Sequence, residues 1–161
     1  MKKLLGIIGI LMICLSMNAQ VDKRNLFAVE AGTGSALSNF VVNLGFRWQM
    51  NLHPNIAWDV LTVKATTTPD SDILDAMLAE GMTGVRLTSY EFAGMSVYAI
   101  GKVGYGHYID ISNGGVCYEF GAGLNITSHL SVGYAFNEMS YKDSGVKCKW
   151  KSHSFQIGWT F

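Results

Sequence analysis

Three histidines have a serine close to them in the sequence, and such pairs have the residue types of the base and nucleophile in acyl-transfer chemistry. The pairs are His107 with Ser112, His129 with Ser131, and His153 with Ser154. Catalysis needs both side chains on one face, whereas neighbouring strand residues such as 153 and 154 point to opposite faces. We therefore expect no catalytic residues and no enzyme, and we interpret the histidines as loop and rim residues.

The basic stretch 142–151 is a second candidate for binding chemistry. It contains four lysines and one acid: Lys142, Lys147, Lys149, Lys151 and Asp143. Ammonium groups bind phosphate oxygens as point charges, so this predicted loop is a candidate phosphate site. A solvated, lysine-rich loop is the alternative.

The first residues have the pattern of an export signal. A positive start and an apolar run from Leu4 to Leu15 precede small residues that offer cleavage after Ala19. We expect a signal peptide over 1–19 and one domain over 20–161, because no repeat or linker marks a second domain.

Cysteine spacing and net charge limit the other partners. Export would allow Cys117 and Cys148 to form a disulfide, and two free thiols are the alternative. The cysteines and histidines show neither CxxC nor HxxxH spacing, so we expect no metal and no cofactor. The 12 basic and 12 acidic residues cancel, which argues against nucleic acid as a partner.

Alternation of large apolar residues with polar or small ones is the main pattern of the chain. It is clear in 40–49, 116–126, 130–137 and 154–161, and rougher in 25–34, 56–66, 82–91 and 95–109. Because strand side chains alternate between faces, each segment is predicted to be a strand with one apolar and one polar face. Register stays open around Leu61 and Val63 and around Tyr98 and Ile100, which fall on the polar side.

Strand length and connection length together favour a membrane barrel. Strands of about 11 residues cross a bilayer when they are tilted. Short connections at 51–55, 92–94 and 127–129 alternate with longer ones at 67–81, 110–115 and 142–151. Short turns at one rim and longer loops at the other are typical of an up-and-down barrel in a membrane.

Charge placement decides which face points outward. The apolar faces carry no charged residue at the positions that define them. The polar faces carry three acids and three bases: Glu30, Arg47, Asp59, Arg86, Lys102 and Glu119. Enclosed charges are costly unless they are paired, so a narrow lumen requires such a balance. We therefore predict an all-β, eight-stranded antiparallel transmembrane barrel with an apolar exterior and an interior charge network. A soluble barrel with these six charges in water is the alternative.

The signal sequence, the eight alternating segments and the terminal Ser-Phe-Gln-Ile-Gly-Trp-Thr-Phe resemble small outer-membrane β-barrel proteins of Gram-negative bacteria. The similarity is to the OmpA transmembrane-domain and OmpX type, in a form typical of Bacteroidetes. It implies a location in the outer membrane, and it implies that Phe155, Trp159 and Phe161 form the signal read by the outer-membrane assembly machinery. We expect no peptidoglycan-binding domain after Phe161.

This resemblance makes a structural or surface-interaction role our expectation, with a monomer that contacts outer-membrane lipid. The four lysines would then contact lipopolysaccharide phosphates. A general pore is not expected, because diffusion porins use about 16 strands. The alternatives are a narrow channel and a barrel enzyme that removes or transfers lipid A acyl chains. Against the enzyme, the turn at 127–129 places His129 and Ser131 at the periplasmic rim.

Overall fold

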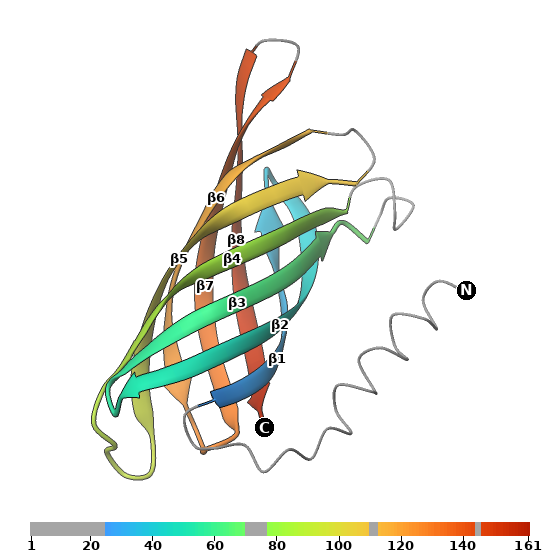
Figure 1. Ribbon diagram of the computed structural model, residues 1–161. Helices are drawn as coiled ribbons and strands as arrows, with labels where there is room; N and C mark the ends of the chain where they lie inside the picture. The colour runs from blue at the N-terminus through green and yellow to red at the C-terminus, as the bar shows by residue number, and fades with distance from the viewer. Residues whose placement is uncertain (1–24, 70–76, 110–112, 144–145) are drawn as a thin grey trace, which may run out of the picture.

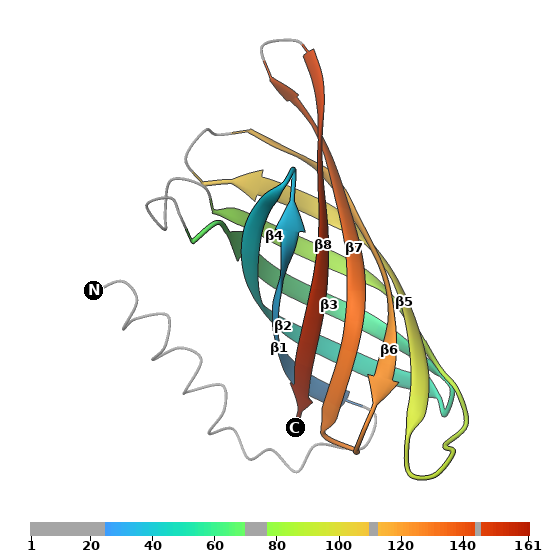
Figure 2. The same cartoon turned by 180° about the vertical axis from the view of Figure 1, so that it is seen from behind.

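The structure, a computed structural model, describes residues 25–69, 77–109, 113–143 and 146–161. The predicted signal peptide lies outside these described residues. Eight strands are formed: β1 (Asn25–Ala36), β2 (Asn39–His53), β3 (Ile56–Thr67), β4 (Leu78–Thr88), β5 (Ser96–Tyr108), β6 (Gly114–Asn125), β7 (Leu130–Asp143) and β8 (Val146–Thr160). Each strand pairs with the next in chain order, and β8 pairs antiparallel with β1 to close a barrel (Figure 1). Figure 2 shows the closing pair side by side. The predicted eight-stranded antiparallel barrel is confirmed.

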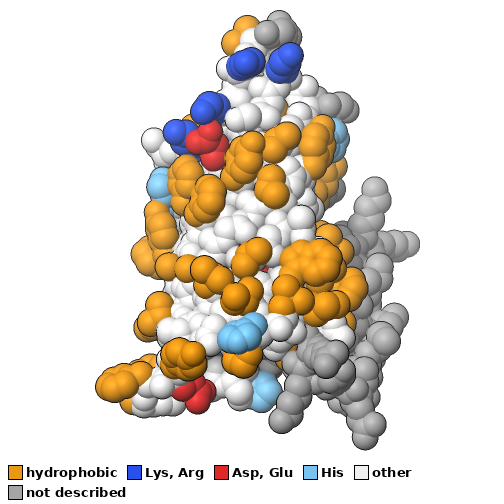
Figure 3. Space-filling view, turned by 60° about the vertical axis from the view of Figure 1, so that its left-hand side comes forward, with side chains coloured by type: hydrophobic (Ala, Val, Ile, Leu, Met, Phe, Trp, Pro, Cys, Tyr) orange, Lys and Arg blue, Asp and Glu red, His pale blue; other side chains and the backbone are white. Residues whose placement is uncertain are grey.

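The outer surface of the barrel is apolar, as the two-residue period predicts. On β8 the side chains of Phe155 and Ile157 are 70% and 60% exposed, whereas Ser154 and Gln156 between them are buried. Hydrophobic side chains are distributed widely over the outer face in Figure 3. Alternation therefore turns the large apolar residues away from the lumen and the small or polar ones into it. No helix within the described ranges is long and apolar enough to cross a membrane.

The two rims are distinguished by their connections. The lower rim in Figure 1, where β8 ends, has the connections 54–55, 89–95 and 126–129, and the upper rim has 37–38, 68–77, 109–113 and 144–145. The predicted pattern of short turns at one rim and longer loops at the other is wrong: the lower-rim connection 89–95 has seven residues, the upper-rim connection 144–145 has two, and at the upper rim β1 and β2 are joined by a tight turn. Its two residues, Leu37 and Ser38, have φ of 48° and 74°, as in the two-residue turns that match the strand twist.

The stretch 142–151 is a hairpin and not the predicted loop. Strand β7 continues to Asp143 and β8 begins at Val146, and the two rise above the other strands in Figure 1. The lysines of this stretch alternate with the less polar Cys148 and Trp150, so the two-residue period continues through it and favours strand over loop.

A β-bulge explains the uncertain register in 56–66. The pairing of β3 with β4 shifts between Asp59 and Thr62, and both of these side chains are buried while Leu61 is exposed. The bulge therefore resets the alternation, so that Lys64 points inward and Val63 outward. Strand β5 contains no such shift in its pairing, and its Tyr98 and Ile100 do face the lumen.

The lumen is filled differently at its two ends. Towards the upper rim it contains an apolar cluster built from β1, β2, β4, β6, β7 and β8: Ala36, Val41, Leu78, Met82, Cys117, Met139 and Trp150. Below this cluster most of the large buried side chains are polar or charged, and Tyr98 and Ile100 lie among them. The barrel thus has an apolar core near one end and an ionic core through the rest.

Candidate functional site

An uninterrupted series of ion pairs runs through the lower and middle lumen. It starts near the lower rim, where Arg86 Nη2 lies 3.6 Å from Glu30 Oε1. The same oxygen lies 2.9 Å from Arg47 Nε, and Arg47 Nη1 lies 3.6 Å from Asp59 Oδ1. On the other side of Asp59, Oδ2 is 3.9 Å from Lys102 Nζ. The signs alternate along the series, so each ion has a counterion beside it.

The series continues towards the apolar cluster. Lys102 Nζ lies 3.0 Å from Glu119 Oε1, and Lys64 Nζ lies 2.5 Å from Glu119 Oε2. Lys64 also lies 3.2 Å from Glu80 Oε2. The series ends at β7, where Asn137 Nδ2 donates a hydrogen bond of 2.8 Å to Glu80 Oε1. We call these eight charged residues the ion chain.

The ion chain carries no net charge and is almost entirely buried. It contains four acids and four bases: Glu30, Asp59, Glu80, Glu119, Arg47, Lys64, Arg86 and Lys102. Several kcal/mol are needed to remove each such ion from water, so neutrality within the lumen is what makes its burial tolerable. The six charged residues that the sequence analysis assigned to the polar faces all lie in it.

Sequence reasoning missed Lys64 and Glu80 for identifiable reasons. The bulge in β3 reverses the phase before Lys64. Glu80 lies in the predicted loop 67–81, whereas β4 begins at Leu78. The alternation of Lys64 with Val63 and Ala65 was a usable signal for the first residue, because it continues the two-residue period after the break.

The four lysines of the β7–β8 hairpin all lie on its outer face. Lys142 pairs in register with Lys147, and Glu138 pairs with Lys151. The carboxylate of Glu138 forms ion pairs with the other two lysines, with its oxygens 2.9 Å from Lys149 Nζ and 3.5 Å from Lys151 Nζ. Directly opposed like charges destabilise a strand pair. The pair Lys142 and Lys147 is therefore a suitable site for an anion, and blue side chains gather at this upper end in Figure 3.

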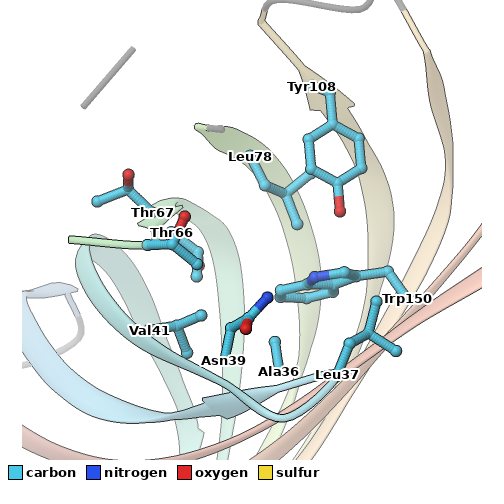
Figure 4. A pocket seen from close by; sticks show the side chains of 10 residues that line it. Ala36, Leu37, Asn39, Val41, Thr66, Thr67, Leu78, Tyr108 and Trp150 are labelled. Atoms are coloured by element: carbon cyan, nitrogen blue, oxygen red, sulfur yellow. The ribbon is translucent and has the colours of Figure 1, made fainter. Parts of the chain in front are cut away.

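A cavity of about 200 Å³ opens at the upper rim, above the apolar cluster. Its walls are Ala36, Val41, Leu78 and Trp150 together with polar residues such as Thr66. In Figure 4 the Trp150 side chain reaches across the cavity towards β2. Trp150 and its neighbours thus separate this cavity from the ion chain below.

The predicted histidine and serine pairs are not brought together. Ser131 and Ser154 are buried in the lumen, whereas His129 and His153 are exposed. The partner predicted for His107, at position 112, lies outside the described residues. His129 Nδ1 instead lies 2.8 Å from the carbonyl oxygen of Thr160 at the lower rim.

A different serine lies beside His153 on the outer face. Ser35 of β1 pairs in register with His153 of β8, and both side chains are exposed. The hydroxyl of Tyr134 is hydrogen-bonded to Nδ1 of His153. Sequence spacing offered no signal for this arrangement, because closure of the barrel brings β1 beside β8.

Cys117 and Cys148 are both free thiols, so the candidate disulfide is absent. Cys117 lies on β6 and Cys148 on β8, with β7 between them. Two strand spacings amount to about 9 to 10 Å, whereas a disulfide needs Cα atoms within about 7 Å. The described residues contain no group of His, Cys, Asp and Glu arranged to bind a metal ion.

The residues of the predicted assembly signal lie at the lower end of β8 and point outward. Phe155, Trp159 and Phe161 are 70%, 50% and 46% exposed. Trp159 packs against the His129 ring with ring centroids 5.7 Å apart. Their recognition by assembly machinery stays a prediction.

A closed eight-stranded barrel with an apolar exterior and a charged lumen defines the outer-membrane class of β-barrels. No protein-family model and no curated protein matches the sequence. Solved structures show the same fold. The outer membrane enzyme PagL is 15% identical with a TM-score of 0.63, covering 81% of this chain and 97% of that one. Neisserial surface protein A is 5% identical with a TM-score of 0.58, covering 85% and 96%. The N-terminal barrel domain of Pseudomonas aeruginosa OprF is 12% identical with a TM-score of 0.54, covering 86% and 98%.

Proposed function

We propose that this protein is an integral outer-membrane barrel of a Gram-negative bacterium, closed to ions and solutes, that acts in envelope structure and in contacts made by its outer surface. The observation that carries this proposal is the ion chain. Eight buried charges in alternating order fill a lumen that is barely wide enough for side chains in a barrel of this strand number.

The filled lumen is the reason to favour a closed barrel over a channel. A passing ion would have to break contacts such as the one of 3.0 Å between Lys102 and Glu119. Above these ion pairs, the buried side chains of Trp150 and Met139 in the apolar cluster occupy the upper lumen. Breaking a buried ion pair costs several kcal/mol, which makes opening rare.

Three measurements test this proposal: gel migration, conductance and cell fractionation. The purified protein should migrate as a compact band in cold detergent and more slowly after boiling, because a closed barrel resists unfolding by detergent. In planar bilayers it should show no conductance at the nanosiemens level. Conductance at that level would overturn the closed-barrel proposal, and recovery of the protein from the aqueous periplasmic fraction would overturn the membrane location.

The outer contacts that we propose are with phosphate groups of lipopolysaccharide, made by the lysines of the hairpin. Lysines on the outer face of β8 are followed downward by His153 and then by Phe155 and Ile157. Cations above an apolar face match the order of phosphate and acyl chain in a leaflet. This hairpin would therefore contact phosphates while the barrel below it contacts hydrocarbon.

A pair of double variants tests the lipid contact. Lys142→Gln with Lys147→Gln should weaken binding of lipopolysaccharide, because these lysines oppose each other. Lys149→Gln with Lys151→Gln removes the same charge from lysines already paired with Glu138, so it should have the smaller effect. Equal affinity of the parent and the first variant would end the proposal.

A second candidate function rests on the outer cluster of Ser35, His153 and Tyr134. The hydrogen bond from Tyr134 fixes the His153 ring, and Ser35 lies directly across the strand pair. A serine opposite an oriented histidine has the residue types of a nucleophile with its base. On a lipid-facing surface its substrate would be an acyl ester of lipid A.

Mass spectrometry of lipid A distinguishes this candidate from the structural role. Cells that express the parent protein should carry an altered acyl pattern, and cells that express Ser35→Ala should not. An identical pattern with and without the protein would leave the structural and surface-contact role alone.

A further inference from the structure

The lower rim contains a second cavity, on the opposite side of the ion chain from the first. It has a volume of about 160 Å³, space for about five water molecules at about 30 Å³ each. Its lining is mostly polar and includes two cations, Arg47 and Arg86. Neutral polar residues in the lining include Gln49, Ser96, Asn125 and Ser128. Closure of the barrel does not by itself explain why two guanidinium groups line one small polar cavity.

Arg86 is the less well compensated of the two. Its side chain is only 5% exposed, and its ion pair with Glu30 spans 3.6 Å. The guanidinium carbon lies 4.0 Å from the centre of the Tyr98 ring, while the buried Nε has no hydrogen-bond partner. A buried polar group is normally hydrogen-bonded, so a free donor on a buried cation beside a cavity indicates a missing acceptor.

Arg47 differs because its charge is already shared. It contacts Glu30 at 2.9 Å and Asp59 at 3.6 Å, and its Nη1 also donates to Gln49 Oε1. The buried Nε of Arg47 has no hydrogen-bond partner either. Arg47 has two counterions, however, whereas Arg86 pairs with Glu30 alone among the described residues, so Arg86 is the less compensated cation at the cavity. Guanidinium groups match carboxylate and phosphate oxygens in geometry and charge.

Neutral donors complete the lining. Asn125 Nδ2 donates a hydrogen bond of 2.9 Å to Ser96 Oγ, which leaves the Ser96 hydroxyl proton free to donate in turn. The exposed Ser128 belongs to the turn at the entrance, and the exposed Glu91 is the acid among the lining residues. The deep wall is thus cationic and the acid is confined to an exposed loop.

We propose that this cavity binds a small oxyanion, a carboxylate or a phosphate, with Arg86 as its principal ligand and Ser96 as a second donor. The cavity has room for a group of the size of phosphate or acetate. This inference goes beyond the proposed function and does not depend on it, because the site lies on the opposite rim from the lysine hairpin and the Ser35 cluster.

Side-chain NMR of the refolded barrel in detergent tests the site. The chain has three arginines, so the Nε–H signals of ¹⁵N-labelled protein are few. Sodium phosphate and sodium acetate are titrated separately, with sodium chloride at equal ionic strength as the reference. The Arg86 Nε–H signal should shift and saturate with phosphate, acetate or both, and the arm that saturates identifies the class of anion. Shifts that match those in chloride would overturn the site.

Two single variants distinguish anion binding at this cavity from a general effect of the charge of the protein. Ser128→Asp places a carboxylate in the exposed turn at the entrance, where substitution leaves the lumen intact, and should weaken binding about tenfold or more. Ser38→Asp places the same charge in the tight turn of the opposite rim and should leave the affinity unchanged. Unchanged affinity in Ser128→Asp, or an equal loss in both variants, would overturn the proposal.

Discussion

Replacement of Glu119 by Gln removes the carboxylate that lies within 3.0 Å of two lysine ammonium groups of the ion chain. Its two oxygens lie 3.0 Å from Lys102 Nζ and 2.5 Å from Lys64 Nζ. At an effective dielectric constant of about 20, each contact amounts to about 5 to 7 kcal/mol of gross Coulomb attraction. Most of this is offset by the desolvation of the ions, and loss of one partner from a buried pair costs about 3–5 kcal/mol. We expect Glu119→Gln to lower the free energy of unfolding by that amount.

A charge-balanced double variant isolates the electrostatic cause. In Glu119→Gln the lumen gains an uncompensated positive charge, and Lys102 keeps only Asp59 at 3.9 Å. Adding Lys102→Met restores neutrality with a side chain of similar length. The double variant should recover about 2 kcal/mol or more of the loss, because no unpaired ion is then buried.

Urea unfolding of the refolded barrel in lipid vesicles, followed by tryptophan fluorescence, measures both variants. The transition must be reversible for the free energies to be compared. A Glu119→Gln protein within about 1 kcal/mol of the parent would refute the reasoning. So would a double variant that is no more stable than the single one.

Three further predictions concern the core, the hairpin and the thiols. Leu78→Ala, at a side chain 1% exposed, should cost about 2–5 kcal/mol in urea unfolding, and Leu124→Ala on the outer face, 43% exposed, should cost clearly less; equal losses would contradict the apolar cluster. Lys147→Glu should slow amide hydrogen exchange at the hairpin end, because it turns an opposed like-charge pair into an attractive one worth about 0.2–1 kcal/mol; faster exchange would contradict this. In a chain that begins after the predicted signal peptide, and so without Cys14, a maleimide should label Cys148 alone in the folded barrel and both Cys117 and Cys148 after unfolding, since Cys117 is 0% exposed; labelling of Cys117 in the folded state would show that the lumen opens.

The sequence was informative wherever the two-residue period is unbroken. In β2 from Val42 onward and in β8 from Phe155 onward, large apolar residues recur at every second position and the structure turns them outward. Val41 and Trp150, nearer the upper rim, instead point into the lumen. The period failed at one bulge, between Asp59 and Thr62, because an inserted residue changes the face of everything after it. For that reason alone, the sequence analysis did not assign Lys64 to the interior of the barrel.

Contacts between distant strands were beyond reach of the sequence pattern. Alternation assigned Glu30 and Arg86 to a polar face, but it did not predict that β1 and β4 face each other across the lumen and form an ion pair. The same holds for Ser35 and His153, which become neighbours only because β8 closes onto β1. A period describes one strand at a time, whereas a site in a barrel depends on the curvature and the closing register of all the strands.

The ion chain also specifies the register of the barrel. Its contacts join different strands, as between Arg47 of β2 and Asp59 of β3 or between Lys102 of β5 and Glu119 of β6. A slip of one residue in any of these strands would turn its charged side chain outward and its apolar residues inward. An arginine or lysine facing the middle of the hydrocarbon costs about 2–4 kcal/mol, and the abandoned counterion in the lumen adds a further penalty. The same eight side chains that fill the lumen therefore discriminate against misregistered barrels, so the interior charge is a determinant of the fold.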